Sequence, residues 1–411
     1  MRRVSLSWML NYSAARVGIG IHDIFYNSMA NLLLHDTYGL SNALSGFLSN
    51  ERSFIGSVLQ PVIGGMSDRT STPWGRRRPF IALSVPITIL GFLLLMAYPP
   101  TWLVVLLFIL GPLFLSLAVI PYQALLPDSV APEQRGTVSG IGVLVGFSAG
   151  VVLLLAAGLL KLWERQQALV FLLVAFALAI SFLITIVSVR EPRALEAPGP
   201  RPSVRPLAYL RDVLRYREAT KYVACYFFFW FGIGGVTPFI TRFGKEELGI
   251  AEGRTFLLLV SVLITTLLFA APAGWLGDRY GKKRLMSWGL LAFAILIFIG
   301  SQQNSLMLIV PILALAGVAQ AATSVLSYPL FTELVPARRM GELTGLSQMV
   351  WSLAQPLGAT ILGFVADQTG TLRSVLMGAG VSLFVSFLIL QTVRVPAEVP
   401  SPSPAEVEAQ G

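Results

Sequence analysis

Gly64-Gly65-Met66-Ser67-Asp68-Arg69, with Gly75-Arg76-Arg77-Arg78 a few residues later, closes the second long apolar stretch of this chain. Gly274-Trp275-Leu276-Gly277-Asp278-Arg279, followed by Gly281-Lys282-Lys283-Arg284, closes the eighth stretch in the same way. One basic hairpin therefore occurs twice, about 200 residues apart. Internal repeats of this kind are typical of membrane transporters. The spacing predicts a duplicated membrane protein with six spans in each half.

The composition agrees with a membrane protein. The chain is 55% hydrophobic and only 12% charged, whereas about a quarter of the residues of a soluble domain are charged. Most of the twelve apolar stretches are close to the ~20 residues that cross a hydrocarbon core. The expected spans are 8–33, 40–66, 79–98, 102–126, 137–160, 168–189, 221–241, 255–276, 285–301, 306–331, 343–365 and 374–393.

The charges predict the orientation. Of the 30 lysines and arginines, 22 lie on the side of the two hairpins, counting Lys221 at the start of a span, and 6 lie in the opposite loops. Positive residues favour the cytoplasmic side, so we expect a multi-pass protein of the cell membrane with both termini in the cytoplasm. The net charge of +9 is explained by topology and contact with anionic lipid, not by nucleic acid.

The expected organisation has four parts. Residues 1–189 and 221–394 form the two six-helix halves, 190–220 is a cytoplasmic linker, and 395–411 is a disordered tail rich in Pro and Glu. Within the linker, Leu207, Leu210, Val213 and Leu214 recur at helical spacing between arginines. This pattern favours a basic amphipathic helix on the membrane surface, and a partner-binding helix is the alternative.

A second repeat supports the duplication. Asp128, Val130, Gly136 and Gly140 align with Glu333, Val335, Gly341 and Gly345 at a constant offset of 205. A membrane-anchored enzyme would have no reason for this symmetry, so we expect no catalytic residues. The chain also lacks the G-x-x-x-x-G-K-[ST] loop of ATP-driven pumps.

These residues resemble the major facilitator superfamily, whose signature Gly-x-x-x-Asp-Arg occurs here in both halves. The resemblance covers nearly the whole chain. The insert of the first copy and its ending Trp74-Gly75-Arg76-Arg77-Arg78-Pro79, together with Pro121-Tyr122-Gln123, are similar to the glycoside–cation symporters, the melibiose and sucrose carriers. The resemblance implies an all-α membrane protein with 12 transmembrane helices in two six-helix halves around a central cavity.

The resemblance also implies a role for the hairpins in gating. We expect Asp68 to face the start of the eleventh span and Asp278 the start of the fifth, near Thr137, because a carboxylate is stabilised at a helix N-terminus. The alternative is that the hairpins only set topology and packing. The gating set comprises Asp68, Arg69, Gly75, Arg76, Asp278, Arg279, Gly281 and Lys282.

Ionisable residues inside the first two spans are the candidates for ion coupling. Asp23 and Glu51 are each ~15 Å from the outer end of their helix, so antiparallel neighbours would bring them to one depth. Charged groups at that depth are costly and usually functional. Asp23, with Glu51, is therefore predicted to form a site for H+ or Na+, with Arg52 keeping one of the acids ionised and His22 assisting. A structural salt bridge of Asp23 or Glu51 with Arg52 is the alternative. The two-acid pattern of the resembled group is missing from the second span, which argues against Na+ more than against coupling.

The predicted substrate residues lie on the spans that line the superfamily's cavity. They are Tyr26, Asn27, Tyr122, Gln123, Tyr226, Trp230, Gln320 and Tyr328. Aromatic faces with amides and hydroxyls suit a sugar, although polar side chains also bind helices to one another. We expect a monomeric secondary transporter of a sugar or glycoside, with H+ or Na+ and no other cofactor. An efflux antiporter for amphipathic compounds and a non-transporting sensor or assembly factor remain the alternatives.

Overall fold

The structure is a computed structural model that describes residues 4–70, 72–189, 217–334 and 340–395. These residues form helices and short connections, without a β-strand among them. The N-terminal half comprises α1 (Leu6–Ile24), η1 (Phe25–Met29), α2 (Ala30–Leu32), η2 (Leu33–Thr37), α3 (Asn42–Arg69), α4 (Arg78–Leu95), α5 (Thr101–Ser129), α6 (Pro132–Leu159), α7 (Leu162–Arg165) and α8 (Gln167–Ser188). The C-terminal half comprises α10 (Arg217–Val236), η3 (Thr237–Phe239), α11 (Ile240–Glu246), α12 (Glu252–Tyr280), α13 (Lys282–Ser301), α14 (Leu306–Leu334), α15 (Met340–Thr369) and α16 (Arg373–Thr392).

The described residues form twelve helical spans. Within the described residues, ten helices are long and apolar enough to cross a membrane. The remaining two are α3 and the first span, in which α1 continues through two π-helical segments, η1 and η2. The predicted all-α architecture is confirmed. The linker helix predicted within 190–216 and the tail 396–411 lie outside the described residues.

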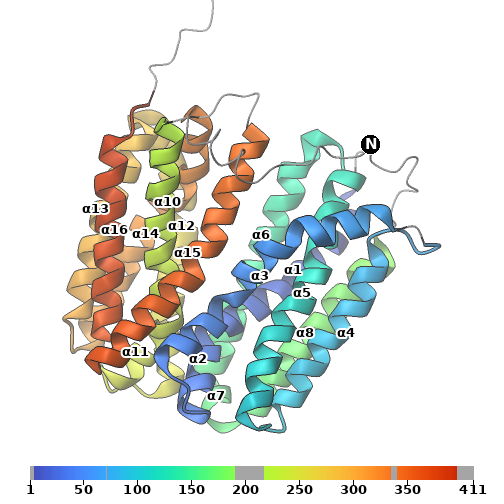
Figure 1. The fold of residues 1–411 in the computed structure, drawn as a ribbon, viewed down its shortest axis with the longest axis horizontal. Coiled ribbons are helices and arrows are strands. Elements are labelled where there is room, and N and C mark those ends of the chain that lie inside the picture. The colour runs from blue at the N-terminus through green and yellow to red at the C-terminus, as the bar shows by residue number, and fades with distance from the viewer. Residues whose placement is uncertain (1–3, 71, 190–216, 335–339, 396–411) are drawn as a thin grey trace, which may run out of the picture.

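The same packing occurs twice. In the N-terminal half, α1 packs against α6 and α8, and α4 packs against α5 and α8. In the C-terminal half, α10 packs against α15 and α16, and α13 packs against α14 and α16. The helices that correspond in chain order therefore have corresponding neighbours, and the two halves stand side by side (Figure 1).

Local signals set the helix ends. The Ser41 hydroxyl accepts a hydrogen bond from the backbone nitrogen of Leu44 and starts α3. Proline in the first turn begins α4 and α6. Between paired helices the chain turns at Gly75 (φ 106°) and at Gly281 (φ 92°), a left-handed region that glycine enters without steric cost. Both hairpins therefore contain a glycine for the same physical reason.

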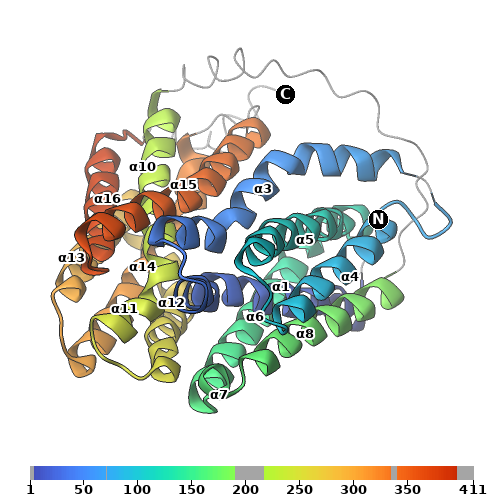
Figure 2. The same ribbon diagram turned by 60° about the horizontal axis from the view of Figure 1, so that its bottom comes forward.

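The two ends of the bundle differ. We call the end with the hairpins at Gly75 and Gly281 the hairpin face, and the end with loops 38–41 and 247–251 the joined face. Figures 1 and 2 show α3 and α15 meeting near the start of α3 and diverging toward its end. A Cβ added at Gly46 would lie 2.7 Å from the carbonyl oxygen of Ala359. Glycine is therefore needed for the close contact between the halves at the joined face.

Candidate functional site

Asp23 lies about halfway along the first span, two residues before the start of the π-helical segment η1. π-helical turns inside α-helices are frequent at functional sites. The Asp23 side chain keeps 41% of its surface exposed, and its Oδ1 lies 3.5 Å from Nδ1 of His22. The structure thus brings together two of the four residues predicted to couple an ion.

The His22 ring is fully buried within the N-terminal half. It stacks on Tyr26 with ring centroids 4.4 Å apart and meets Phe92 edge-on at 5.7 Å. Asp23 is thus the exposed member of the pair and His22 the buried one. The side chains of Glu51 and Arg52 lie outside the described residues, so their predicted approach to Asp23 stays a prediction.

A stack of aromatic rings follows the polar face of α1. Tyr12 is stacked between Trp8 (5.4 Å) and Tyr122 of α5 (4.6 Å). The Tyr122 hydroxyl donates to the carbonyl oxygen of Tyr12 at 3.0 Å, and the Tyr12 hydroxyl donates to the carbonyl oxygen of Tyr122 at 3.3 Å. The Arg16 guanidinium lies 5.8 Å from the centre of the Tyr122 ring. This group places a cation on a polarisable aromatic face.

The C-terminal half repeats the arrangement. The Tyr222 hydroxyl donates to the carbonyl oxygen of Ser327 at 2.6 Å, as Tyr12 does to Tyr122 in the other half. Tyr226 stacks on Tyr222, and the Trp230 ring meets Tyr226 and Trp351 edge-on. Two of the predicted substrate residues, Tyr226 and Trp230, therefore share one aromatic row.

The other predicted substrate residues are more scattered. Tyr26 is 5% exposed and packs against Phe25 and Phe108 inside the N-terminal half. The Asn27 amide donates to the carbonyl oxygen of Asp23 at 2.8 Å, which ties it to the candidate ion site. Tyr122 is fully buried, Gln320 is half-buried, and Gln123 and Tyr328 are exposed. The side chains gathered by the fold are therefore Tyr122 with Tyr12, and Tyr226 with Trp230.

Arg242 joins the two halves. The sequence places it in an outer loop, yet its side chain is 1% exposed in α11. It hydrogen-bonds to Glu246 Oε1 at 2.8 Å and, across the interface, to Oδ1 of Asn31 at 3.2 Å and Oδ1 of Asn42 at 2.5 Å. A buried guanidinium needs such partners, because removing a charge from water is expensive.

Carboxylates reinforce this contact. Asp36 lies beyond the apolar part of the first span; its Oδ2 is 2.6 Å from Lys245 Nζ and its Oδ1 is 3.7 Å from Arg242 Nε. The Asp36 carboxylate thus lies beside two cations of the other half and attracts both.

Two further carboxylates cap helices across the interface. Asp367, at the end of α15, accepts from the backbone nitrogens of Asn42 and Ala43 at the start of α3. Glu164 of α7 accepts from the backbone nitrogen of Gly253 at the start of α12, at 2.6 Å. Each half thus supplies a negative charge to a helix N-terminus of the other, where the helix dipole favours it. Sequence analysis missed both pairs, since only the distances in the fold reveal them.

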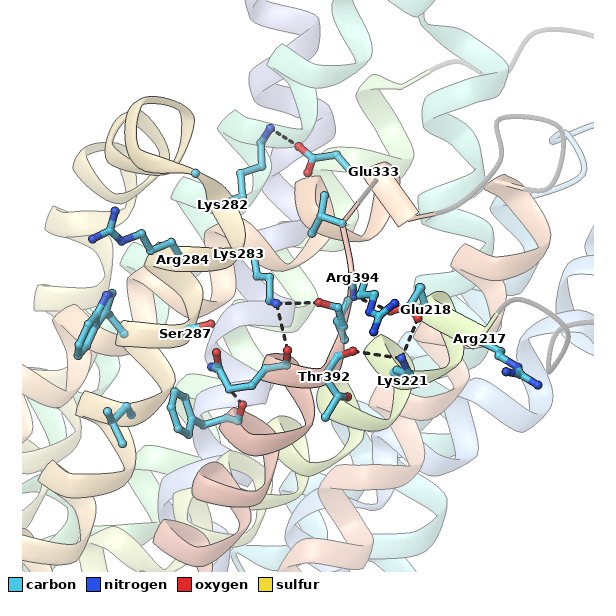
Figure 3. Close-up of a pocket in the computed structure, with 17 residues that line it drawn as sticks. Arg217, Glu218, Lys221, Lys282, Lys283, Arg284, Ser287, Glu333, Thr392 and Arg394 are labelled. Atoms are coloured by element: carbon cyan, nitrogen blue, oxygen red, sulfur yellow. Dashed lines mark hydrogen bonds and ion pairs between the residues drawn. The ribbon is translucent and has the colours of Figure 1, made fainter. Parts of the chain in front are cut away.

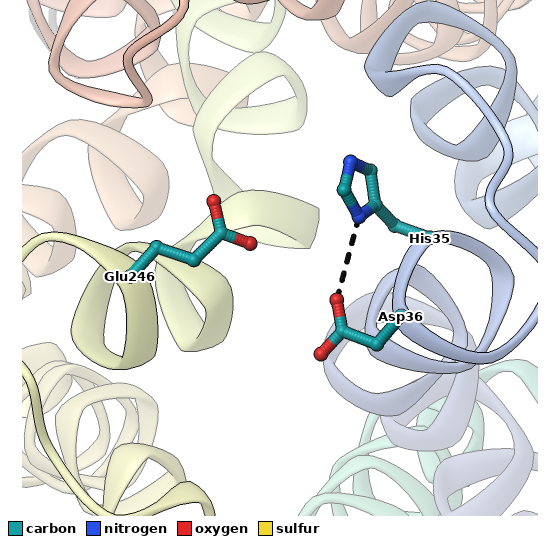
Figure 4. Close-up of side chains that lie close together, drawn as sticks. All are labelled: His35, Asp36 and Glu246. Atoms are coloured by element: carbon teal, nitrogen blue, oxygen red, sulfur yellow. Dashed lines mark ion pairs between the residues drawn. The ribbon is translucent and has the colours of Figure 1, made fainter.

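His35, Asp36 and Glu246 could also be considered as metal ligands (Figure 4), since their ligand atoms lie within 4.8 Å of one another. The surroundings argue for another use. Lys245 and Arg242 already bring two positive charges to these carboxylates, and a divalent cation would be repelled by both. The cluster is best described as an ion-pair network between the halves.

The hairpins make ion pairs within their own halves. Arg76 Nη2 lies 3.0 Å from Asp128 Oδ2, and Lys282 Nζ lies 2.5 Å from Glu333 Oε1. These two acids, Asp128 and Glu333, occupy corresponding positions in the two sequence repeats. Asp278 is 74% exposed, and its described ion pair is with Lys282 at 3.9 Å. The predicted approach of Asp278 to Thr137 of α6 is not among the described contacts.

The remaining gating residues are placed as follows. Arg279 lies over the rings of Trp275 and Tyr280, 5.5 and 5.7 Å from their centres. The side chains of Asp68 and Arg69, and the region at the start of α15 that Asp68 is predicted to face, lie outside the described residues. The hydrogen bonds between the halves made by Asn42, Ala43, Asn50, Thr241, Arg242, Lys245 and Gly253 lie toward the joined face.

Comparisons with known proteins agree with this architecture. The family model of MFS/sugar transport proteins matches residues 11–407. The sucrose transport protein SUC3 of Arabidopsis thaliana is 33% identical over 143 residues, which cover 28% of this chain and 24% of that protein. The chain thus spans about a quarter of the length of SUC3.

Two longer matches complete the comparison. A homologue of the multi-drug resistance efflux pump PmrA from Lactococcus lactis is 26% identical over 358 residues, or 83% of this chain and 82% of that protein. Among solved structures, a bacterial homologue of the human lysosomal transporter Spinster, inward-facing and unoccupied, superposes with a TM-score of 0.72. It is 17% identical and covers 95% of this chain and 98% of its own. This likeness concerns the fold.

Proposed function

Because the chain belongs to the MFS/sugar transport protein family, we propose that it moves a sugar or glycoside across the membrane together with H+ or Na+, by alternating access. It is a multi-pass membrane transporter of the major facilitator fold, not an enzyme. The observation that carries the coupling proposal is Asp23, a half-exposed carboxylate beside His22 halfway along the first span. An ionisable group at that depth requires a cation or a proton to offset its desolvation.

Side chains of both halves are proposed to bind the solute. Arg16 of one half and Tyr226 and Trp230 of the other are partly exposed and are proposed to contact the solute, whereas the buried rings of Tyr12 and Tyr122 support Arg16 from below. Ring faces stack on the CH faces of a sugar, while hydroxyl, indole and guanidinium groups bind its oxygens. The partial match to a sucrose transport protein supports this class of solute.

The hairpin face is proposed to be cytoplasmic, because it carries most of the Lys and Arg residues. On that orientation the joined face is the outer gate. In this proposal the joined face, held closed by Arg242, Asp367 and Glu164, corresponds to an inward-facing state of the transport cycle. Single cysteines at positions 165 and 200, in a Cys225→Ser background, test the orientation. Labelling from outside the cell should reach position 165 and not 200; the reverse result overturns it.

The efflux antiporter is the second candidate, supported by the match to the PmrA homologue along most of both chains. Purified full-length protein in proteoliposomes separates the two. Sugars, glycosides and fluorescent amphipathic cations would be offered under an imposed pH gradient, an imposed Na+ gradient, or neither. Accumulation of a sugar or glycoside driven by one gradient supports symport. Proton-driven export of the dyes without any sugar uptake supports the antiporter and overturns the symporter.

A further inference from the structure

A large basic cavity lies at the hairpin face, outside the site described above. It has a volume of about 1460 Å³ and lies where α10 and α13 begin and α16 ends (Figure 3). Six cationic residues line it against two acids: Arg217, Lys221, Lys282, Lys283, Arg284 and Arg394, with Glu218 and Glu333. Such an excess of positive charge favours an anionic ligand.

Two of the six cations are paired with the two acids. Lys282 pairs with Glu333, and Lys221 pairs with Glu218 at 2.7 Å. Lys283 donates to the carbonyl oxygens of Gln391 and Val393 and so caps the end of α16. Arg284 makes no ion pair with any described residue.

Ser287 provides an independent sign of a ligand. The residue lines the same cavity and is 9% exposed. Its hydroxyl oxygen is buried and has no hydrogen-bond partner among the described residues. Buried hydroxyls are normally satisfied, because leaving one unpaired costs about 1–3 kcal/mol. Arg284 and Ser287 lie on adjacent turns at the start of α13 and offer a cation and a hydroxyl.

The surface next to the cavity is apolar. One turn beyond Arg284, the Trp288 ring is 61% exposed, followed on the same face of α13 by Ile295. On the neighbouring α16, Phe384 and Leu388 are exposed. Exposed apolar stripes on membrane helices contact acyl chains, and tryptophan is enriched at headgroup depth. The basic cavity thus lies at the boundary between headgroups and hydrocarbon.

We propose that this cavity binds the phosphate headgroup of an anionic phospholipid, held by Arg284 and Ser287, with its acyl chains along Trp288 and the stripe of α16. A soluble phosphate ester shares the headgroup chemistry, but it would leave the adjoining apolar stripes unused. The proposal rests on the membrane-spanning fold and not on the transported solute, so it survives if sugar symport is wrong.

The test uses full-length protein in detergent, with bound lipid counted by native mass spectrometry. Phosphatidylglycerol, phosphatidylcholine with the same acyl chains, and glycerol 3-phosphate serve as probes. The wild type should retain phosphatidylglycerol in preference to the other two. Arg284→Gln should weaken that binding about fivefold, and Arg284→Gln with Ser287→Ala about 30-fold, from about 1 kcal/mol for each group.

Arg165→Gln, which removes one exposed arginine from the joined face, is the matched control and should bind as the wild type does. Melting temperatures without lipid verify that the variants fold. Equal retention of phosphatidylcholine, equally tight binding of glycerol 3-phosphate, or undiminished phosphatidylglycerol binding by the double variant would each overturn the proposal.

Discussion

The carboxylate of Asp367 accepts hydrogen bonds from the backbone nitrogen of Asn42 at 2.9 Å and from that of Ala43 at 3.0 Å, so the end of α15 caps the start of α3 in the other half. Glu164 caps α12 in the reciprocal direction. The duplication of the chain has thus produced two equivalent fastenings, each of which must break before the joined face opens.

The first prediction concerns these caps. Asp367→Asn removes a charge that is worth about 1 kcal/mol at a helix N-terminus, which should lower the population closed at the joined face about fivefold relative to the open one. Glu164→Gln should act in the same direction. Spin labels in loops 38–41 and 302–305 would report longer distances. Lys161→Gln, a charge change on the same face outside the interface, is the control; identical distance distributions in all variants would refute the role of the caps.

We expect Arg242 to stabilise the closed joined face more strongly than the helix caps of Asp367 and Glu164 do. Arg242→Met leaves the oxygens of Asn31, Asn42 and Glu246 without their donor, and breaking a buried pair costs about 3–5 kcal/mol. Because Glu246 is partly exposed, we expect about 2 kcal/mol here. The variant should melt at a lower temperature and open at the joined face. Arg242→Lys keeps the charge but not the planar fork and should be intermediate. A Met variant with unchanged melting temperature and distances would contradict this account.

Much of the architecture follows from the sequence, and the reason is visible in particular residues. The hairpins at Gly75 and Gly281 combine a required backbone conformation with a dense positive charge, and both signals are local. The partners of Arg242 and Asp367 are far apart in the chain. In the sequence, Arg242 looks like any arginine of a loop that follows an apolar run. Only the burial of its side chain in the structure identifies Arg242 as a contact between the halves. Tyr26 is the opposite case. It lies on a span that lines the cavity in the superfamily and is therefore predicted to bind substrate, but its ring packs inside the N-terminal half.

We expect contacts between the halves to form at the hairpin face in the other state of the cycle, in which the joined face is open. Asp278 is 74% exposed here, so Asp278→Asn should leave the melting temperature of the present state unchanged. If Asp278 meets the start of α6 when the hairpin face closes, the variant should depopulate that form, as should Asp68→Asn. Distances between spin labels near positions 137 and 278 would measure the population of the form that is closed at the hairpin face. The double change Asp278→Asn with Asp367→Asn should bring the populations back toward the wild type. If the two changes instead add in one direction, the reciprocal gating scheme is wrong.

Glu247 makes one outer loop of the C-terminal half pH-dependent. Partial burial opposes its ionisation, but hydrogen bonds from Thr371, the Leu372 nitrogen and Arg373 outweigh it and lower the pKa of Glu247. A lowered folded-state pKa stabilises the protein fully above the unfolded value and loses that effect as pH falls through the folded value. The protection factors of the amides of residues 370–374, corrected for the intrinsic pH dependence of exchange, should therefore fall as pH drops below 4.5, the ordinary value for glutamate. Glu247→Gln should exchange faster at neutral pH and lose this dependence; a wild type with the same profile as the variant would exclude Glu247 as the cause.

The last prediction concerns coupling by Asp23. Asp23→Asn imitates a permanently neutral site, so uphill accumulation of the solute should disappear, while exchange of solute between the two sides survives because the loaded carrier still changes state. The measurement is gradient-driven uptake compared with counterflow in the same proteoliposomes. If Asp23 only forms a salt bridge with Arg52, Asp23→Asn should instead lower the melting temperature, since the charge of Arg52 is left uncompensated. Asp23→Asn with Arg52→Gln would then restore both folding and uphill transport. Such a rescue would disprove coupling at Asp23, because no ionisable group would remain at that position, whereas preserved exchange without accumulation is the result that coupling requires.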